Sequence, residues 1–381
     1  GQLQSVSNRL GPTLTYQNFN GLGQPGRVTG ANGEATEYLY DARGRVTRVR
    51  SFPNGSSAAD TTYAYAASGL LDSVTRPDGV QRKYIYDAAR RLMAEYEVNG
   101  SGLYPYRLLT RDLASNITVE RIGASSTVPT LGTTEGLTGR SYIDYDELSR
   151  VRAVRRNNGQ NLRYTYDPNG NIKTLTDSLG KVTTRTYDIL DRLIQSKDPL
   201  NGLAEYGYDA ADNLTRVSDP RGNVTTYAYD GLGQLWSRTS PETGTMTFTH
   251  NAKGQMTQMI RSGGGATDYA YDSVGRLTSA TVGTQVLSYA YDTCTNGKGR
   301  ICSASSPGTT TGFTYEPDGR LRQRTEAITV SGVPTSHATT YAYDAVGRLS
   351  AITYPSAVAT GYSYTHGRLT GMTATIGATT S

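Results

Sequence analysis

A 21-residue period constrains this 381-residue chain more than any other feature of its sequence. Aligned on the dipeptide Tyr-Asp, the chain divides into fifteen units, and from Tyr145 to Tyr271 the spacing is 21 residues six times in succession. The segments Tyr269–Ala280 and Tyr341–Ile352 are near copies of each other. Repeats of this length are units that stack on their neighbours, so the chain is predicted to be a repeat array.

Each unit has the pattern of a β-hairpin. Two aromatic residues flank a small or β-branched one, as in Tyr164-Thr165-Tyr166, which places both rings on one face of a strand. The Asp that follows, with a Gly or Asp three residues later, predicts a type I turn closed by a bulge, in which the Asp carboxylate accepts from backbone N–H groups. The next residue is most often Arg, whose planar group is expected to hydrogen-bond sideways and to lie over Tyr rings. An apolar residue then begins the return strand, and turns such as Asp219–Gly222 close the unit.

The predicted fold is therefore all-β. We expect a continuous antiparallel meander of about 15 hairpins, coiled into a spiral sheet or shell wall, with little or no helix because no stretch keeps a 3.6-residue period. The chain has 29 Tyr but only 4 Phe and 1 Trp. A Tyr ring can pack along a sheet while its hydroxyl reaches water, so a wet wall is expected rather than a dry core.

The chain is predicted to be a single array, and the spacings that differ from 21 residues divide it into five stretches. Residues 1–37 are degenerate first units, 38–120 irregular repeats, 121–141 an inserted solvent loop, 142–275 regular repeats, and 276–381 repeats with variable loops. The longer spacings are interpreted as inserted loops. Because the first residues match the second half of a unit, the chain is expected to be a segment of a longer one.

A set of repeat-signature positions is predicted to form the turns and the ladder of side chains. Their role is interpreted as structural, and the carboxylates among them as turn formers. These positions are Tyr40, Asp41, Gly44, Tyr86, Asp87, Tyr145, Asp146, Tyr166, Asp167, Gly170, Tyr187, Asp188, Tyr208, Asp209, Tyr229, Asp230, Gly233, Tyr271, Asp272, Gly275, Arg276, Tyr291, Asp292, Tyr343, Asp344, Gly347 and Arg348.

No catalytic, metal or cofactor site is predicted. His250 replaces a repeat Tyr, His337 falls in a lengthened connection and His366 in a shortened turn, and these positions support neither a Ser/His/Asp grouping nor a set of metal ligands. The Gly-rich segment Ser262–Thr267 lacks the Lys of a phosphate-binding loop and is interpreted as a return turn. An enzyme is thus the least favoured class of function.

The charge of the chain follows from the repeat. The net charge of +5 comes from 32 Arg and six Lys against 33 acidic residues. Such a surplus can indicate nucleic-acid binding, but Arg in one repeated structural position explains it, so no nucleic-acid partner is predicted. No window approaches the roughly 20 apolar residues of a membrane helix, and no membrane span is predicted.

Two cysteines form a possible disulfide. Cys294 and Cys302 flank an enlarged turn that contains Asn296-Gly297, a strong hairpin signal that would place them opposite each other. The alternative is a pair of free thiols, which a reducing cytosol would favour.

The consensus of this chain, roughly Gly-x-x-x-x-Tyr-x-Tyr-Asp-x-x-Gly-Arg-Leu, resembles the YD repeat of bacterial RHS proteins. It is also similar to repeats in the C component of Tc toxin complexes and in teneurin shells. The resemblance covers essentially the whole chain. It implies a hollow β-cocoon that encloses a C-terminal toxin, or a role in cell-surface contact. A counterpart of the family's autoproteolytic, core-associated region is not recognised in the sequence.

We therefore expect a non-enzymatic wall segment of a shell that encapsulates or presents a toxin or effector. The expected partners are the remainder of its own longer chain and an enclosed polypeptide, and the expected location is secreted or at a bacterial cell surface, reached through a toxin-delivery system. The alternative is a surface or secreted protein whose exposed Tyr and Arg bind glycans or another cell. No cofactor is expected in either case.

Overall fold

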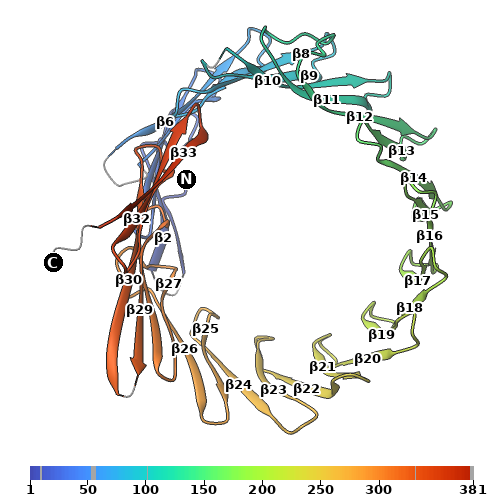
Figure 1. Ribbon diagram of the computed structural model, residues 1–381, viewed down its shortest axis with the longest axis vertical. Helices are drawn as coiled ribbons and strands as arrows, with labels where there is room; N and C mark the ends of the chain where they lie inside the picture. The colour runs from blue at the N-terminus through green and yellow to red at the C-terminus, as the bar shows by residue number, and fades with distance from the viewer. Residues whose placement is uncertain (9–10, 53–56, 101, 331, 378–381) are drawn as a thin grey trace. The chain divides into compact units, whose positions relative to one another are not determined.

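The computed structural model describes residues 1–8, 11–52, 57–100, 102–330 and 332–377. Within these ranges the chain forms 33 strands of one antiparallel sheet and no helix (Figure 1). The described residues accordingly include no helix long and apolar enough to cross a membrane. The all-β antiparallel prediction is confirmed.

The strands fall into two compact units. Unit 1 comprises Gly1–Tyr84, Glu97–Ser101 and Tyr269–Ser381, and unit 2 comprises Ile85–Tyr96 and Gly102–Asp268. Unit 1 thus contains the first and the last repeats of the chain. Its strands are β1 (Ser5–Asn8), β2 (Gly11–Gln17), β3 (Arg27–Gly30), β4 (Ala35–Tyr40), β5 (Val46–Ser51), β6 (Ala59–Tyr65), β7 (Leu71–Thr75), β25 (Leu277–Val282), β26 (Gln285–Tyr291), β27 (Ile301–Ser306), β28 (Thr309–Tyr315), β29 (Leu321–Val330), β30 (Val333–Tyr343), β31 (Leu349–Thr353), β32 (Val358–Thr365) and β33 (Arg368–Ile376).

Unit 2 contains the most regular repeats. Its strands are β10 (Tyr104–Arg111), β11 (Ile117–Ser125), β12 (Leu137–Tyr145), β13 (Val151–Arg156), β14 (Asn161–Tyr166), β15 (Ile172–Thr176), β16 (Val182–Tyr187), β17 (Leu193–Lys197), β18 (Leu203–Tyr208), β19 (Leu214–Ser218), β20 (Val224–Tyr229), β21 (Leu235–Ser240), β22 (Gly244–His250) and β23 (Met256–Ile260). The strands β8 (Gln81–Tyr86), β9 (Leu92–Val98) and β24 (Ala266–Tyr271) include the residues where the units divide.

The turn after each Tyr-Asp pair has the predicted geometry. Between β14 and β15 the Asp167 N–H donates to the Asn171 carbonyl at 3.0 Å, and the Gly170 N–H donates to the Asp167 carbonyl at 3.1 Å. The strand register shifts at Tyr166, and Gly170 has a φ of +96°. A left-handed residue is needed at this position, and Asp191 and Asp212 supply it where Gly is missing, with φ of 61° and 65°.

We call these connections Tyr-Asp turns and the intervening ones return turns. Because consecutive strands run in opposite directions, the Tyr-Asp turns of a unit lie on one edge of its sheet and the return turns on the other. Asp146–Arg150 is a Tyr-Asp turn and Asp177–Lys181 a return turn.

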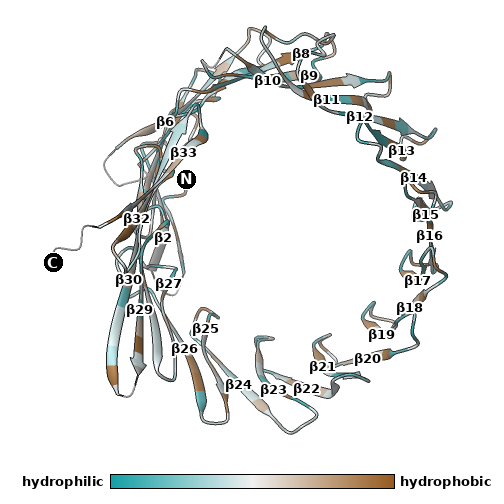
Figure 2. Cartoon of the chain, viewed as in Figure 1, coloured by the Kyte–Doolittle hydropathy of each residue, from teal (hydrophilic) through white to brown (hydrophobic). Residues whose placement is uncertain are grey.

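Few side chains are fully buried. In unit 2 a small cluster forms around Ala94, Tyr106 and Leu108, with Tyr96 packed against it. Hydrophobic and hydrophilic residues otherwise alternate along the strands instead of gathering in a separate layer (Figure 2). The sheet is therefore stabilised mainly by contacts between successive hairpins.

The predicted loop at residues 121–141 is strand at both of its ends, which corrects the sequence-based boundaries. β11 continues to Ser125 and β12 begins at Leu137, so the connection is 126–136. It is not a plain solvent loop: Ser125 is fully buried and its hydroxyl donates to Glu135 Oε2 at 2.7 Å, while the Tyr106 hydroxyl donates to the Glu135 carbonyl at 2.9 Å. These bonds satisfy polar groups that the extended hairpin would otherwise bury unpaired.

The 28-residue spacing before Tyr343 is likewise made of longer strands rather than an inserted loop. β29 and β30 have 10 and 11 residues and pair along their length. His337, which the sequence placed in a connection, lies in β30 opposite Glu326. The extra residues are rich in Thr, Val and Ile, and β-branched residues favour strands.

Candidate functional site

Each repeat contains a cluster of Asp, Arg and Tyr that joins one hairpin to the next. Asp146 Oδ1 accepts hydrogen bonds from the backbone N–H groups of Leu148 at 3.0 Å and Arg150 at 2.9 Å, and its Oδ2 accepts from Arg150 Nε at 2.7 Å. The Arg150 guanidinium carbon lies 4.4 Å from the ring centroid of Tyr166 in the next unit. The Tyr166 hydroxyl donates to the carbonyl of Val151 at 2.7 Å. The cluster therefore closes one turn and ties two hairpins together.

The same cluster recurs in both units. An Arg of the turn lies over the Tyr of the following repeat, and that Tyr hydroxyl donates to the carbonyl of the apolar residue just after the Arg. The pairs, with the distance from guanidinium carbon to ring centroid, are Arg45 and Tyr65 (4.2 Å), Arg192 and Tyr208 (4.8 Å), Arg276 and Tyr291 (4.3 Å), Arg300 and Tyr315 (5.6 Å), Arg320 and Tyr343 (4.1 Å), and Arg348 and Tyr364 (4.5 Å).

Some repeats of unit 2 keep the hydroxyl bond without an Arg. Asn171 occupies the Arg position and its amide donates to Asp167 Oδ2 at 3.1 Å. The next ring has no guanidinium from this residue over it, yet the Tyr187 hydroxyl still donates to the Ile172 carbonyl at 3.1 Å. The bond from hydroxyl to carbonyl is therefore the constant link, and the stacked Arg is an addition to it.

The expectation that the Tyr hydroxyls reach water is wrong for the Tyr that precedes Asp. Its hydroxyl is used inside the sheet, and burial raises the pKa of Tyr166, Tyr229 and Tyr343 above the ordinary value. The acceptor lies in the preceding hairpin, 15 residues earlier for Tyr166 and Tyr229 and 22 residues earlier for Tyr343.

The repeat carboxylates are held as anions. The backbone and guanidinium hydrogen bonds from Arg150 lower the pKa of Asp146, and the guanidinium of Arg192 lowers the pKa of Asp188. Both oxygens of such a carboxylate already accept hydrogen bonds. This arrangement suits a structural turn rather than a group that must take up a proton.

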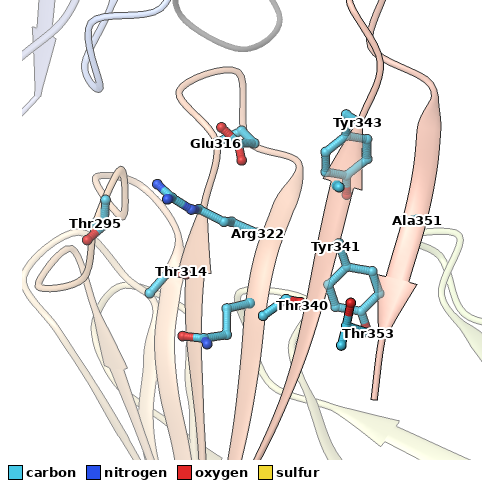
Figure 3. Close-up of a pocket in the computed structure, with 11 residues that line it drawn as sticks. Thr295, Thr314, Glu316, Arg322, Thr340, Tyr341, Tyr343, Ala351 and Thr353 are labelled. Atoms are coloured by element: carbon cyan, nitrogen blue, oxygen red, sulfur yellow. The ribbon is translucent and has the colours of Figure 1, made fainter. Parts of the chain in front are cut away.

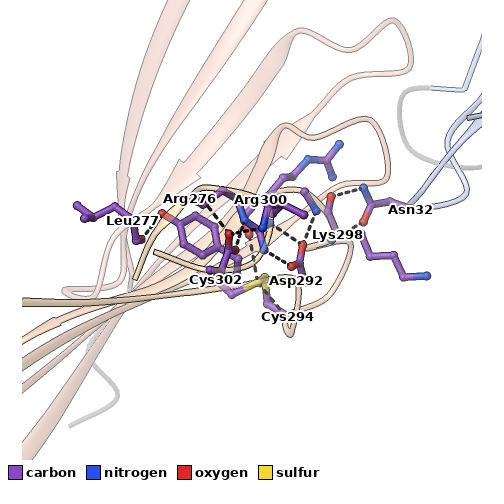
Figure 4. Close-up of polar contacts among 12 residues, drawn as sticks. Asn32, Arg276, Leu277, Asp292, Cys294, Lys298, Arg300 and Cys302 are labelled. Carbon is purple, nitrogen blue, oxygen red and sulfur yellow. Dashed lines mark hydrogen bonds and ion pairs between the residues drawn. A yellow bond between two sulfur atoms is a disulfide. The ribbon is translucent and has the colours of Figure 1, made fainter. Parts of the chain in front are cut away.

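The enlarged turn after β26 is closed by a disulfide in the structure. The Sγ atoms of Cys294 and Cys302 are 2.07 Å apart. A Cβ on Gly297 would lie 2.4 Å and 2.5 Å from the two sulfurs, so this position requires glycine. Arg276 Nη1 donates to Asp292 Oδ1 at 3.0 Å, which fixes the base of the turn (Figure 4).

The same enlarged turn contacts a return turn far away in the sequence. The Lys298 N–H donates to Asn32 Oδ1 at 2.8 Å, and Asn32 Nδ2 donates to the Lys298 carbonyl at 3.0 Å, across 266 residues (Figure 4). Both residues belong to unit 1. An Asn amide that pairs with both polar groups of one peptide unit recognises backbone instead of a particular side chain.

Two further contacts of this kind occur within unit 1. Arg348 Nη1 lies 3.8 Å from Asp78 Oδ2, and a Cβ on Gly367 would lie 2.6 Å from the same oxygen. A Cβ on Gly100 would lie 3.2 Å from His366 Nε2. In all three places a Tyr-Asp turn of the late repeats meets a return turn of the early repeats.

A polar groove of about 740 Å³ lies over β28–β31 in unit 1. Tyr341 and Tyr343 flank one side, and Arg322 and Glu316 the other (Figure 3). The remaining lining residues are Thr295, Thr314, Gln323, Thr340, Ala342, Ala351 and Thr353.

Comparison with known proteins agrees with this repeat chemistry. The family profile described as RHS Repeat matches residues 19–57, 145–181, 166–202 and 208–245, and the profile described as Teneurin YD-shell matches residues 240–369. The chain belongs to the RHS/YD-repeat family. No curated protein matches its sequence.

Solved structures show the same fold at low identity to this RHS/YD-repeat chain. The crystal structure of TcdB2-TccC3-TEV is 15% identical with a TM-score of 0.67, over 96% of this chain and 24% of the other. A Photorhabdus luminescens Tc holotoxin pore with a TccC3 mutation is 14% identical with a TM-score of 0.59, over 93% and 21%. TcdB2-TccC3 without its hypervariable C-terminal region is 11% identical with a TM-score of 0.51, over 96% and 28%. The chain thus spans about a quarter of the length of these chains.

The structure brings the signature residues of this RHS/YD-repeat chain together as small clusters along the array, not as one site. The histidines stay apart: His250 ends β22, His337 lies in β30 and His366 follows β32. The segment Ser262–Thr267 lies in a return turn and the start of β24, with the Gly264 N–H bonded to the Arg261 carbonyl. Sequence reasoning missed the contacts of Asn32 and Asp78, because nothing in a local pattern marks residues that meet a distant repeat.

Proposed function

We propose that this RHS/YD-repeat chain is a wall segment of a shell that encloses a C-terminal effector. The observation that carries the proposal is the fold shared with TcdB2-TccC3 over 96% of the chain. The chain spans a quarter of those proteins, so the enclosure would require further repeats. The remainder of the same polypeptide is the expected source of both the repeats and the cargo.

The chemistry of the repeats supports a wall. Each Asp, Arg and Tyr of the ladder is engaged with its neighbours, and the family fold is a structural shell. The described residues contain no group of three or more His, Cys, Asp or Glu side chains able to hold a metal ion. We infer a non-enzymatic component that is secreted, or delivered with a toxin, by a bacterium.

The test uses the polypeptide encoded by the complete gene, purified and treated with a nonspecific protease. We expect a segment downstream of residue 381 to survive digestion while the repeats are folded and to be degraded once they are unfolded by denaturant. A variant of the same polypeptide with Tyr166→Ala and Tyr208→Ala, which weakens the wall, should lose this protection at lower denaturant. Complete digestion of every downstream segment in the native protein would contradict enclosure.

A second candidate function is glycan binding at the β28–β31 groove. Aromatic faces beside Arg and hydroxyl groups are suited to sugar rings, and this groove presents Tyr341 and Arg322 together. A glycan array should then show binding that Arg322→Ala abolishes and that Arg163→Ala, on a strand of unit 2, leaves unchanged. Equal binding by all three proteins, or none, would exclude this function.

A further inference from the structure

The turns along the two edges of the sheet are more buried in unit 1 than in unit 2. In unit 1 the early return turns are buried where the late Tyr-Asp turns meet them: Val80 is 1% exposed and Asn99 7%. In two of the late Tyr-Asp turns the third residue is a half-buried valine, Val274 and Val346. Within unit 1, turns on one edge of the sheet therefore contact turns on the other edge. Each of these contacts pairs a Tyr-Asp turn with a return turn.

In five turns of unit 2 the same third position is a leucine, and each of these leucines is exposed. In the Tyr-Asp turns Leu148 is 71%, Leu190 60% and Leu232 80% exposed. In the return turns Leu179 is 79% and Leu200 83% exposed. Large apolar residues at the tips of turns on both edges are unlike the polar residues that solvated turns favour, and they are typical of an interaction surface.

The two edges of unit 2 complement each other. Each has leucines at the corresponding turn position, so their tips can bury apolar surface against one another. Beside Leu148 the Tyr-Asp edge has Glu147, and beyond Leu179 the return edge has Lys181, both exposed and of opposite charge. The Arg348 and Asp78 contact in unit 1 shows the same combination of a covered turn and an opposite charge across the two edges.

We propose that the Tyr-Asp edge of unit 2 docks the return edge of unit 2 in a second copy of this chain. The contact is of the same kind as the edge pairing within unit 1, and it is independent of whether the shell encloses an effector. Because the two edges are different surfaces, the contact is heterologous and its two halves can be inactivated separately.

The test measures self-association of the full chain by sedimentation velocity over a range of concentrations. The wild type should form dimers and larger species as concentration rises. Leu148→Glu/Leu190→Glu/Leu232→Glu should weaken self-association by at least about tenfold, and so should Leu179→Glu/Leu200→Glu, because each buries unpaired charges in one half of the contact.

Mixing the two variants is the decisive step. Each retains one intact edge, so an equimolar mixture should form a one-to-one complex that grows no further. The control is Thr165→Glu/Thr186→Glu/Thr226→Glu, which places three acidic groups on exposed positions of the strands instead of the edges and should associate like the wild type.

The proposal would be overturned by a wild type that stays monomeric at all concentrations, by edge variants that associate like the control, or by a mixture that fails to form the one-to-one complex. Replacing the same leucines with Ser distinguishes loss of the contact from loss of the fold, because Ser is favoured in turns and should leave the hairpins folded. The Ser variants should also lose self-association while keeping the circular dichroism spectrum of the wild type. Ser variants that associate like the wild type would equally contradict the docking.

Discussion

The Tyr-Asp turns of unit 1 and unit 2 share their internal chemistry and differ in what they present outward. Asp344 and Asp146 each accept from two backbone N–H groups and from the Arg four residues later. Yet the turn at Arg348 meets Asp78, while the tip of the turn at Asp146 carries an exposed Leu148. The hydrogen bonds inside the turn are thus constant, and the two turns differ in what their tips contact.

Removal of a ladder Tyr should have the largest effect and should be alike in the two units. Tyr166→Ala in unit 2 and Tyr291→Ala in unit 1 each lose a packed ring, a stacked Arg and a hydroxyl bond, at a cost of about 3 kcal/mol. Hydrogen exchange of the flanking strands gives the local free energy of opening, which is preferable to a global melt for a repeat array. The Phe variants, which keep the ring, should lose only about 1 kcal/mol. A much larger loss in one unit would show that the ladder itself depends on edge contacts.

Loss of the disulfide should affect unit 1 alone. Cys294→Ser/Cys302→Ser frees the enlarged turn and should destabilise it by about 2.5 kcal/mol, the value expected for closing a loop of this size. Hydrogen exchange should then rise at Lys298 and at Gly33 next to Asn32, with no change in unit 2. Thiol reductant should reproduce the effect in the wild type and do nothing to the double variant. Mass spectrometry that finds two alkylated thiols without reduction would show that the bond does not form.

A pair of glycine substitutions separates turn strain from edge contact. Gly170→Ala and Gly367→Ala both place a Cβ on a left-handed residue, with φ of 96° and 75°, which costs about 1 to 2 kcal/mol. At Gly170 the nearest atom would be 3.8 Å away, whereas at Gly367 the Asp78 carboxylate would be 2.6 Å away. The Gly367 variant should therefore expose the return turn at Asp78 in addition, seen as faster exchange of the Val80 amide. Unchanged exchange at Val80 would mean that the contact is not held in solution.

The dependence of stability on pH should be the same in both units. The carboxylates of Asp41, Asp146 and Asp188 have pKa values below the unfolded value of about 3.9. Their contribution is present above that pH and is lost as pH falls through the lowered folded pKa. Tyr166 and Tyr343 have raised pKa values, so their contribution is present below about pH 10 and is lost as pH rises through the folded pKa. The denaturant concentration at the midpoint of unfolding should therefore be constant between pH 5 and 9 and should fall below and above that range. A marked change of the midpoint between pH 5 and 9 would contradict this prediction.

Local sequence patterns predicted the hairpins but did not predict the contacts between residues that are far apart in the sequence. The Asp, Gly and Arg of a Tyr-Asp turn lie within five residues, so their geometry could be read from the sequence. The acceptor of the Tyr166 hydroxyl could not, because it is a backbone carbonyl in the preceding hairpin, and carbonyls have no sequence signature. The pairing of Asn32 with Lys298 spans 266 residues, and no local pattern marks which distant turn a residue will meet. A longer spacing between repeats can come from an inserted loop or from longer strands, and the spacing alone does not distinguish them. The interpretation as loops was therefore wrong for β29 and β30.

The hydroxyl bond from each Tyr to the preceding hairpin also has a mechanical consequence. Pulling on the C-terminal end of the ribbon loads the last hairpin first. Strand pairing and its Tyr and Arg hold that hairpin to the one before it, and its turn at His366 and Gly367 also meets the return turns at Gly100 and Asp78. The array should thus yield in successive steps of about one repeat, each at similar force, rather than in a single rupture. Where turn edges touch, as at Asn32 and Lys298, a step should require more force, and the force trace would mark the covered part of the wall.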